Sequence, residues 1–205
     1  MKKLDVANSK NPNFIGVYNI ENNVLCENII NFFEENKNLH MQGAVGHGVD
    51  EKIKKSTDIT VYPYNLKEEK YFLFKEYLNS LNDCYQNYRE TYPFLKKFIK
   101  KVDLGYFNIQ KYLPGGHFAE LHSERTSLQN LHRLFAWMTY LNDVENGATT
   151  NFSHYGIKIK PEIGKTLIWP AEWTHAHTGE VLKSGKKYMI TGWMHFPAPD
   201  FKFDK

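Results

Sequence analysis

Hydrophobic residues in the first half of the chain recur with the spacing of amphipathic helices. Residues 22–36 carry one such stripe, and a longer one follows Asn65, which with Glu68 resembles a helix-capping pair. The stripe positions are Val24, Leu25, Ile29, Phe32 and Phe33 in the first segment and Phe74, Tyr77, Leu78, Leu81 and Tyr85 in the second. Pro93 should end the second helix, because proline has no N–H to donate. Residues 94–102 predict one further short helix.

From residue 104 onward the pattern changes to short aromatic or β-branched runs separated by turn residues. Such runs are typical of strands in an antiparallel sandwich or barrel. They fall at residues 105–113, 133–142, 148–160, 164–170 and 186–196, with one earlier run at 14–20. Residues 37–58 contain glycines and show no period, which predicts a mobile loop. Helices first and strands later indicate a mostly β structure backed by N-terminal helices, and 205 residues fit a single domain, 1–205.

Composition narrows the class of protein. With 41% hydrophobic and 24% charged residues the chain is ordinary globular protein, and a net charge of +3 from scattered lysines gives no case for nucleic acid binding. Cys26 and Cys84 both lie in apolar periodic segments and are expected to be reduced, packed thiols. No apolar signal segment or membrane-spanning run is visible. We therefore expect a cytoplasmic protein that binds neither nucleic acid nor a membrane.

Polar residues occupy one whole face of the strand expected at 105–113. Because successive side chains of a strand point to opposite sides, Phe107 and Ile109 share one face. The other face holds Tyr106, Asn108, Gln110 and Tyr112. A solvent-facing surface is the simpler interpretation. The strand runs, however, into a Pro-Gly-Gly turn and a histidine-containing stretch, so the lining of a polar cavity stays open as the alternative.

Two later strands each carry one polar side chain on an otherwise apolar face. Tyr140 ends the row that begins at Leu134, and Lys187 heads the row that runs to Trp193. A buried phenol needs a hydrogen-bond partner, and a buried ammonium is costly unless an anion meets it. Together they would form a site for a small carboxylate. The alternative is that Lys187 lies at a strand end with its ammonium in water.

The stretch GGHFAELHSER, residues 115–125, contains a candidate metal site. His122 and Glu124 are two positions apart, so their side chains emerge on the same side of an extended segment. A second imidazole comes from His175 or His177. Two histidines and one carboxylate match the facial triad of non-haem Fe(II) oxygenases, which leaves coordination positions open for a cosubstrate and dioxygen. With nine histidines in the chain, an ordinary surface or core histidine is the competing interpretation of each.

Four segments in order resemble the successive core motifs of the Fe(II)/2-oxoglutarate-dependent dioxygenases. The closest similarity is to the prolyl 4-hydroxylase-like branch with its small bacterial and phage members. The segments are YLPGGHFAELHSE, RLFAWMTYLND, GKTLIWP and HTGEVLKSGKKYMITGW. The resemblance covers residues 104–197 and implies a double-stranded β-helix core, a cupin-like jelly roll, packed on α-helices. Residues 1–103 would then be a strand and helical support region.

The resemblance implies a ligand set. The family's His-x-Asp pair falls on His122 and Glu124, and its distal histidine falls on His177, ten residues before Lys187. His175 is the alternative ligand. Glutamate stands where most of the family has aspartate, and the presence of a carboxylate argues against the halogenating relatives, which lack this ligand.

The resemblance also implies the cosubstrate site. Lys187 would pair with the distal carboxylate of 2-oxoglutarate, helped by Tyr140, while Tyr112 lines the pocket. Thr191 and Trp193 match the closing Thr-x-Trp of the last core strand. The residues assigned to the cosubstrate are Tyr112, Tyr140, Lys187 and Thr191, and those that could contact substrate are Arg125, Arg133 and Trp193.

The implied activity is hydroxylation of an unactivated C–H bond with Fe(II), 2-oxoglutarate and O2, releasing succinate and CO2, with ascorbate as a candidate reductant. The expected substrate is a prolyl or other residue of a peptide or protein. The alternatives are a free amino acid or small metabolite and, from another class, a cupin-like metal-binding protein that is not an oxygenase. Residues 37–58 and 125–132 are expected to cover the site, with His117 near its rim. A monomer or a homodimer is expected.

Overall fold

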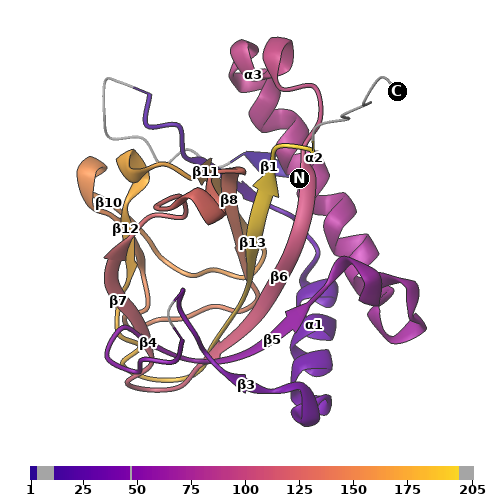
Figure 1. Ribbon diagram of the computed structural model, residues 1–205. Coiled ribbons are helices and arrows are strands. Elements are labelled where there is room, and N and C mark those ends of the chain that lie inside the picture. Colours follow the sequence, from indigo (N-terminus) through magenta and orange to yellow (C-terminus); the bar gives the residue numbers. More distant parts are fainter. Residues whose placement is uncertain (4–11, 47, 199–205) are drawn as a thin grey trace.

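The computed structural model describes residues 1–3, 12–46 and 48–198. Their strands form two antiparallel sheets (Figure 1). The large sheet has the order β1 (Lys2–Lys3), β2 (Gly16–Asn19), β11 (Lys165–Pro170), β8 (Arg133–Tyr140), β13 (Lys187–His195), β6 (Asp103–Tyr112), β5 (Thr57–Val61) and β3 (Met41–Gln42). The small sheet has the order β10 (Ile157–Ile159), β9 (Thr150–Phe152), β12 (His177–Gly179), β7 (His117–His122) and β4 (Lys54–Lys55).

Two long α-helices cover the outer face of the large sheet, and a third, short helix packs against the second (Figure 1). They are α1 (Asn23–Glu35), α2 (Leu73–Thr91) and α3 (Pro93–Phe98). Short 3₁₀ turns connect the elements at Lys37–Leu39, Pro63–Lys67, Glu69–Tyr71, Leu128–Asn130, Ser153–Tyr155 and Trp173–His175. Pro93 begins α3 directly after the end of α2, as expected of a residue that fits the first turn of a helix. No helix in the described part of the chain is both long enough and apolar enough to cross a membrane.

Side-chain alternation on the central strands divides the apolar core into two layers. Phe107 and Ile109 of β6 face the helices and join a cluster with α1 and α2. Tyr112 of the same strand faces the other sheet, in a second cluster that includes Met189 of β13 and Phe152 of β9. The predicted β-sandwich backed by N-terminal helices is confirmed. Its polar inner face on β6 therefore points between the sheets and not into solvent.

The helical predictions hold with two corrections. Val24, predicted to belong to the buried stripe of the first helix, is 65% exposed. Cys26, which was not assigned to the stripe, is fully buried instead. Asn65 does not begin the long helix. It caps a separate 3₁₀ turn by accepting a hydrogen bond from the Tyr62 N–H at 2.8 Å, and α2 starts only at Leu73. Both errors concern helix ends, where neighbouring side chains compete for the same backbone groups.

The segment predicted as a loop at 37–58 is partly β structure. It contains β3, β4 and the first residues of β5. The short strands have no visible period because they are only two residues long. β7 and β12 were also not predicted as strands, although the extended conformation expected around His122 is present.

Both cysteines are buried and free, as predicted. Cys26 lies in α1 and Cys84 in α2, within the helix-facing core. Burial raises the pKa of the Cys26 thiol to about 11 and that of Cys84 to about 12, which keeps both thiols protonated. They act as small apolar side chains in the core.

Candidate functional site

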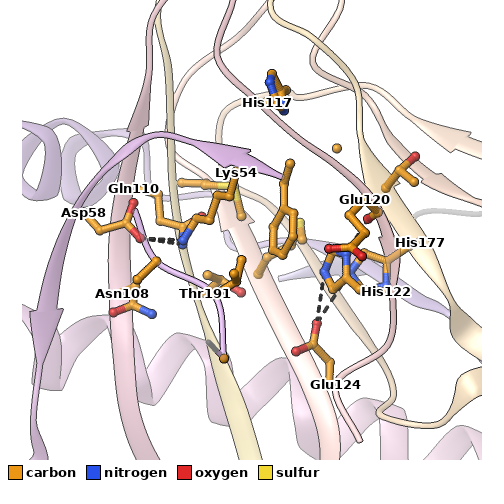
Figure 2. A pocket seen from close by; sticks show the side chains of 18 of the residues that line it. Lys54, Asp58, Asn108, Gln110, His117, Glu120, His122, Glu124, His177 and Thr191 are labelled. Carbon is orange, nitrogen blue, oxygen red and sulfur yellow. Dashed lines mark hydrogen bonds and ion pairs between the residues drawn. The ribbon is translucent and has the colours of Figure 1, made fainter. Parts of the chain in front are cut away.

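The two sheets enclose a cavity of about 790 Å³ at one end of the sandwich. Its walls come from the inner faces of β6 and β13 on one side and from β7 and β12 on the other (Figure 2). Residues 41–46 and several residues of 126–130 contribute to the rim. These are parts of the two segments expected to cover the site.

His122, Glu124 and His177 converge in this cavity (Figure 2). Nε2 of His177 lies 3.5 Å and Nε2 of His122 lies 3.9 Å from Oε1 of Glu124. Two ligand atoms bound at right angles to one ion, each about 2.1 Å from it, lie about 3 Å apart. A small inward shift of the three side chains would therefore bring their ligand atoms to metal-binding distance. The two histidines lie opposite each other because His177 pairs with His122 in the β12–β7 ladder.

Hydrogen bonds at the far side of each ring fix the orientation of both imidazoles. Nδ1 of His122 lies 2.8 Å from the Glu120 carbonyl, and Nδ1 of His177 lies 3.0 Å from the His175 carbonyl. With the proton on Nδ1 for these bonds, Nε2 presents its lone pair to the cavity. Burial, reinforced by His122, lowers the pKa of His177 to about 4. The ring is therefore neutral and ready to bind a cation near neutral pH.

His175, the alternative ligand, does not join the cluster. Its Nε2 lies 2.9 Å from the carbonyl oxygen of Asn13 and its Nδ1 lies 3.0 Å from Oγ1 of Thr174. Both ring nitrogens are thus engaged in the protein interior, away from Glu124. The geometry favours His177 as the third member of the cluster.

Glu124 is held by the residues expected to contact substrate. Its Oε2 accepts a 2.7 Å hydrogen bond from the Trp193 indole N–H, which leaves Oε1 facing the histidines. Arg133 donates to the Glu124 carbonyl at 3.0 Å and lies over the Trp193 ring at 3.7 Å. Arg125 forms an ion pair with Glu172 outside the lining of the cavity. One carboxylate oxygen of Glu124 is thus tied to the β13 side of the cavity.

Replacing Trp193 by phenylalanine should weaken metal binding by about 10- to 100-fold, the usual effect of losing a group that orients a ligand. Phenylalanine keeps an aromatic ring but has no N–H, so Oε2 of Glu124 loses its donor. Isothermal titration with Mn(II) or Fe(II) under nitrogen measures the change. An unchanged affinity would show that Glu124 needs no support from Trp193.

Lys187 lies at the inner end of the cavity and is 4% exposed. Its Nζ donates to the Ala148 carbonyl at 3.0 Å and lies 5.2 and 5.3 Å from the ring centres of Tyr112 and Tyr140. In the described part of the chain no carboxylate lies within ion-pair distance of it. Burial lowers the pKa of Lys187 to about 7. A buried cation of this kind fits an incoming carboxylate.

The tyrosines near Lys187 already have hydrogen-bond partners. Tyr140 donates to Oγ1 of Thr150 at 2.6 Å, and Tyr112 donates to Oε1 of Gln110 at 2.9 Å. Burial raises the pKa of both phenols, so each remains protonated. Thr150 lines the cavity, whereas Tyr140 does not. Thr150 was not among the residues predicted from the sequence. Thr191, on the β13 wall, donates to the Trp137 carbonyl at 2.8 Å.

A buried ion pair in the wall was also missed. Nζ of Lys54 lies 2.6 Å from Oδ2 of Asp58, which also accepts from Gln110 at 3.2 Å (Figure 2). Asp58 lies opposite Gln110 in the β5–β6 ladder. The alternation of Asp58 and Thr60 with Ile59 and Val61 was the available signal, since it continues the polar face of β6 onto β5. His117, considered a bystander near the rim, lines the cavity apart from the metal cluster.

The Lys54–Asp58 pair should stabilise the fold by joining β4 of the small sheet to β5 of the large one. Lys54→Met leaves Asp58 buried without its cation and should lower the free energy of unfolding by about 3 kcal/mol. Urea denaturation measures the change. The neighbouring Lys55 makes an exposed 3.6 Å pair with Glu51, so Lys55→Met should cost less than about 1 kcal/mol. Equal effects of the two substitutions would contradict a special role for the buried pair.

Comparisons of the sequence and of the fold with known proteins agree with the chemistry of this cavity. Residues 107–195 match the sequence model of the 2OG-Fe(II) oxygenase superfamily. No curated protein is similar enough in sequence to count as a match. The fold, however, is shared with solved prolyl hydroxylase structures.

Three of these structures are similar over most of both chains. The viral collagen prolyl hydroxylase of Paramecium Bursaria Chlorella virus-1, in its 2OG complex, has a TM-score of 0.65 at 16% identity, over 90% of this chain and 97% of that one. A Pseudomonas putida prolyl-4-hydroxylase gives 0.68 at 15% identity, over 88% and 92%. A Trichoplax adhaerens prolyl hydroxylase, in complex with a hypoxia inducible factor peptide fragment, gives 0.66 at 16% identity, over 93% and 87%.

These similarities confirm the double-stranded β-helix fold and the family resemblance stated from the sequence motifs. The family match favours an oxygenase among the classes of protein considered, since it includes β7, β12, β13 and most of β6, which line the cavity. The alternative of a cupin-like protein without oxygenase activity is not supported. Residues 107–195 therefore match a 2OG-Fe(II) oxygenase domain in sequence, and the chain shares its fold with solved prolyl hydroxylase structures.

Proposed function

We propose that the chain hydroxylates a prolyl residue of a peptide. In this proposal Fe(II) is held by His122, Glu124 and His177, and 2-oxoglutarate is anchored by Lys187. The observation that carries the proposal is the presence, in one cavity, of a converging His-Glu-His cluster and a buried lysine with no carboxylate partner in the described chain.

The residues present fit both groups. Two neutral imidazoles and one carboxylate are a donor set suited to Fe(II) with open positions. The Lys187 ammonium, buried against two tyrosine rings, suits the far carboxylate of a dicarboxylate that reaches toward the metal cluster. When bound, iron and 2-oxoglutarate activate O2, so that a C–H bond becomes C–OH while the cosubstrate leaves as succinate and CO2.

The chain's own contribution is orientation and exclusion of water. The two Nδ1–H hydrogen bonds to backbone carbonyls direct the imidazoles of His122 and His177 into the cavity. Trp193 fixes which carboxylate oxygen of Glu124 faces them. Lys187 sets the direction of the cosubstrate by pairing with one end of it. Thr150, whose hydroxyl contacts that of Tyr140, supplies a polar surface beside the same end.

A peptide is favoured as substrate because similar folds belong to proteins named as prolyl hydroxylases. A free amino acid is the competing substrate. The ammonium and carboxylate of a free amino acid would need charged partners in the cavity wall. Lys54 and Asp58, which could serve, already form an ion pair with each other at 2.6 Å.

The test is a mass-spectrometric screen with Fe(II), 2-oxoglutarate, O2 and ascorbate. Prolyl peptides are compared with free proline and other free amino acids, and a gain of one oxygen is the signal. We expect the gain on prolyl residues of peptides. Gain on a free amino acid alone, at any concentration of peptide, would contradict the proposal.

A further inference from the structure

Phe118 stacks on His122, one member of the candidate metal cluster. The two ring centres are 3.8 Å apart, and the angle between the ring planes is 11°. Phe118 is half-buried in the wall of the cavity and joins neither of the two apolar core clusters. Packing of the apolar core therefore does not account for the position of its ring.

A bulge in β7 makes this stack possible. Phe118 lies opposite Gly179 of β12, and His122 lies opposite His177 of the same strand. Four steps along β7 thus match two steps along β12, so β7 contains two additional residues. In a regular strand, residues four positions apart are separated by about 13 Å. The bulge brings the rings of Phe118 and His122 together in spite of this spacing.

The same bulge supplies the hydrogen bond that orients the His122 ring. The three residues between Phe118 and His122 are exposed, and the middle one is Glu120. The carbonyl oxygen of Glu120 lies 2.8 Å from Nδ1 of His122. The bulge thus fixes His122 at its Nδ1 edge through the backbone and at its face through Phe118. Bulges next to functional sites commonly redirect a side chain in this way.

The two histidines of the cluster differ in how closely they are enclosed. The His177 side chain is 5% exposed, and its ring centre lies 5.4 Å from that of Phe152 and 5.1 Å from that of Trp169. The His122 side chain is 19% exposed. A less enclosed imidazole depends more on each ring that contacts it, so loss of the Phe118 ring should affect the orientation of His122 strongly.

We propose that Phe118 is a positioning residue for the metal site. Its ring fixes the plane of the His122 imidazole, so that Nε2 faces Glu124 and His177 before a metal binds. This inference rests on the proposed function, and it adds a residue outside the His-Glu-His cluster on which metal affinity depends. A ligand that is already oriented loses little rotational freedom on binding, so supporting residues raise metal affinity without contacting the metal.

Two other roles for Phe118 have different consequences. A ring that only fills space would change the stability of the protein and leave its metal affinity as it is. A ring that only contacts the substrate would change peptide binding and leave the metal-free protein as it is. The orientation of His122 in the metal-free protein and the affinity for a metal therefore distinguish the positioning role from both.

Proton NMR of the metal-free native protein tests the stack directly and does not depend on the folding of any variant. The ring protons of His122, assigned by their loss in His122→Gln, should be shifted upfield by the ring current of Phe118. Phe118→Tyr keeps a ring and should keep this shift, whereas Phe118→Leu should lose most of it. His122 ring protons in the native protein at the positions of an unstacked histidine would overturn the proposal.

Anaerobic calorimetry with Co(II), a substitute for Fe(II) that absorbs visible light, tests the consequence for metal binding. Phe118→Leu keeps an apolar side chain but loses the flat ring, and it should bind Co(II) about ten-fold more weakly. Phe118→Tyr should bind within two-fold of the native protein. The visible spectrum of bound Co(II) should change in Phe118→Leu, because the angle of the His122 ligand is less well defined. Native affinity in Phe118→Leu would overturn the proposal.

Tyr155→Leu is the matched control. Tyr155 is also half-buried, and its ring centre lies 5.1 Å from that of His175, a histidine outside the metal cluster. This variant also exchanges an aromatic ring beside a histidine for leucine, but we expect native Co(II) affinity and a native Co(II) spectrum. Equal weakening in Tyr155→Leu and Phe118→Leu would overturn the positioning role.

The positioning role and the proposed function can fail separately. Hydroxylation of prolyl peptides together with native Co(II) affinity in Phe118→Leu would contradict the positioning role and leave the proposed function standing. Tight Co(II) binding that weakens about ten-fold in Phe118→Leu, without hydroxylation of any prolyl peptide by the native protein, would contradict the proposed function and leave the positioning role standing.

Discussion

Replacing His177 by alanine should abolish tight binding of Fe(II), with a loss of affinity above 100-fold. Groups that only orient a ligand contribute about 10- to 100-fold, so loss of a ligand itself should exceed that range. The neutral imidazole of His177 faces Glu124 at 3.5 Å, and its pKa of about 4 means that no proton competes with the metal near neutral pH. Anaerobic titration of Fe(II), or of Mn(II) as a redox-stable substitute, measures the loss.

His175→Ala is the matched control because it removes a buried histidine two residues away. The ring of His175 is bound to Asn13 and Thr174 and does not face the metal cluster. We expect lower thermal stability but metal affinity within a few-fold of the native protein. Loss of metal binding in His175→Ala with retention in His177→Ala would reassign the ligand.

Replacing Lys187 by methionine should weaken 2-oxoglutarate binding by about 100-fold or more, since removal of one partner of a buried charge pair typically costs about 3 to 5 kcal/mol. Iron binding should be unchanged, because Lys187 does not contact the metal cluster. The matched control is Lys165→Met. Lys165 is also buried but pairs with Glu162 at 2.6 Å on β11, away from the cavity. Comparable weakening in both variants would show that the effect is not specific to the cavity.

The pH dependence of the same binding follows from the lowered pKa of Lys187. In the free protein Lys187 loses its proton near pH 7, whereas an anion beside it favours the charged form and raises its pKa again. Binding of 2-oxoglutarate above pH 7 should therefore take up a proton and weaken as the pH rises. The dependence should vanish in Lys187→Met.

The lowered pKa of Lys187 also affects stability in the absence of 2-oxoglutarate. Between about pH 7 and 10 Lys187 binds a proton in the unfolded chain but not in the folded one, so the free energy of unfolding should rise with pH through that window.

The fold was predictable from periodicity wherever an element was long. The strands from β6 onward that carry four or more apolar or aromatic residues were placed correctly, as were α1 and α3. The helix α2 was recognised, but it begins at Leu73 and not at Asn65. Among the elements that were missed, β3, β4 and β12 have only two or three residues, whereas β7 has six but few apolar ones. Elements this short have no readable period, because sheet pairing with a longer neighbour determines their conformation.

The residues of the candidate site could be predicted to different extents, and for different physical reasons. Lys187 could be recognised because a charge on an apolar face demands a partner, and the two-residue spacing of His122 and Glu124 already placed their side chains on one side. From the sequence, the preference for His177 over His175 rested on the ten-residue spacing to Lys187 that the family resemblance implies. The physical reason lies in the β12–β7 register, which joins residues 55 positions apart. The alternation on β5 could have placed Asp58 on the polar face, but its ion pair with Lys54 could not be predicted, since Lys54 lies in a two-residue strand of the other sheet.

The most direct test of the account is the formation of succinate from 2-oxoglutarate by the purified protein, with Fe(II) and O2 each omitted in turn. Native protein should form succinate only when both are present. His177→Ala should form none, and His175→Ala should form it at a rate near that of the native protein. Absence of succinate together with absence of 2-oxoglutarate binding by native protein would contradict the account, as would undiminished succinate formation by His177→Ala.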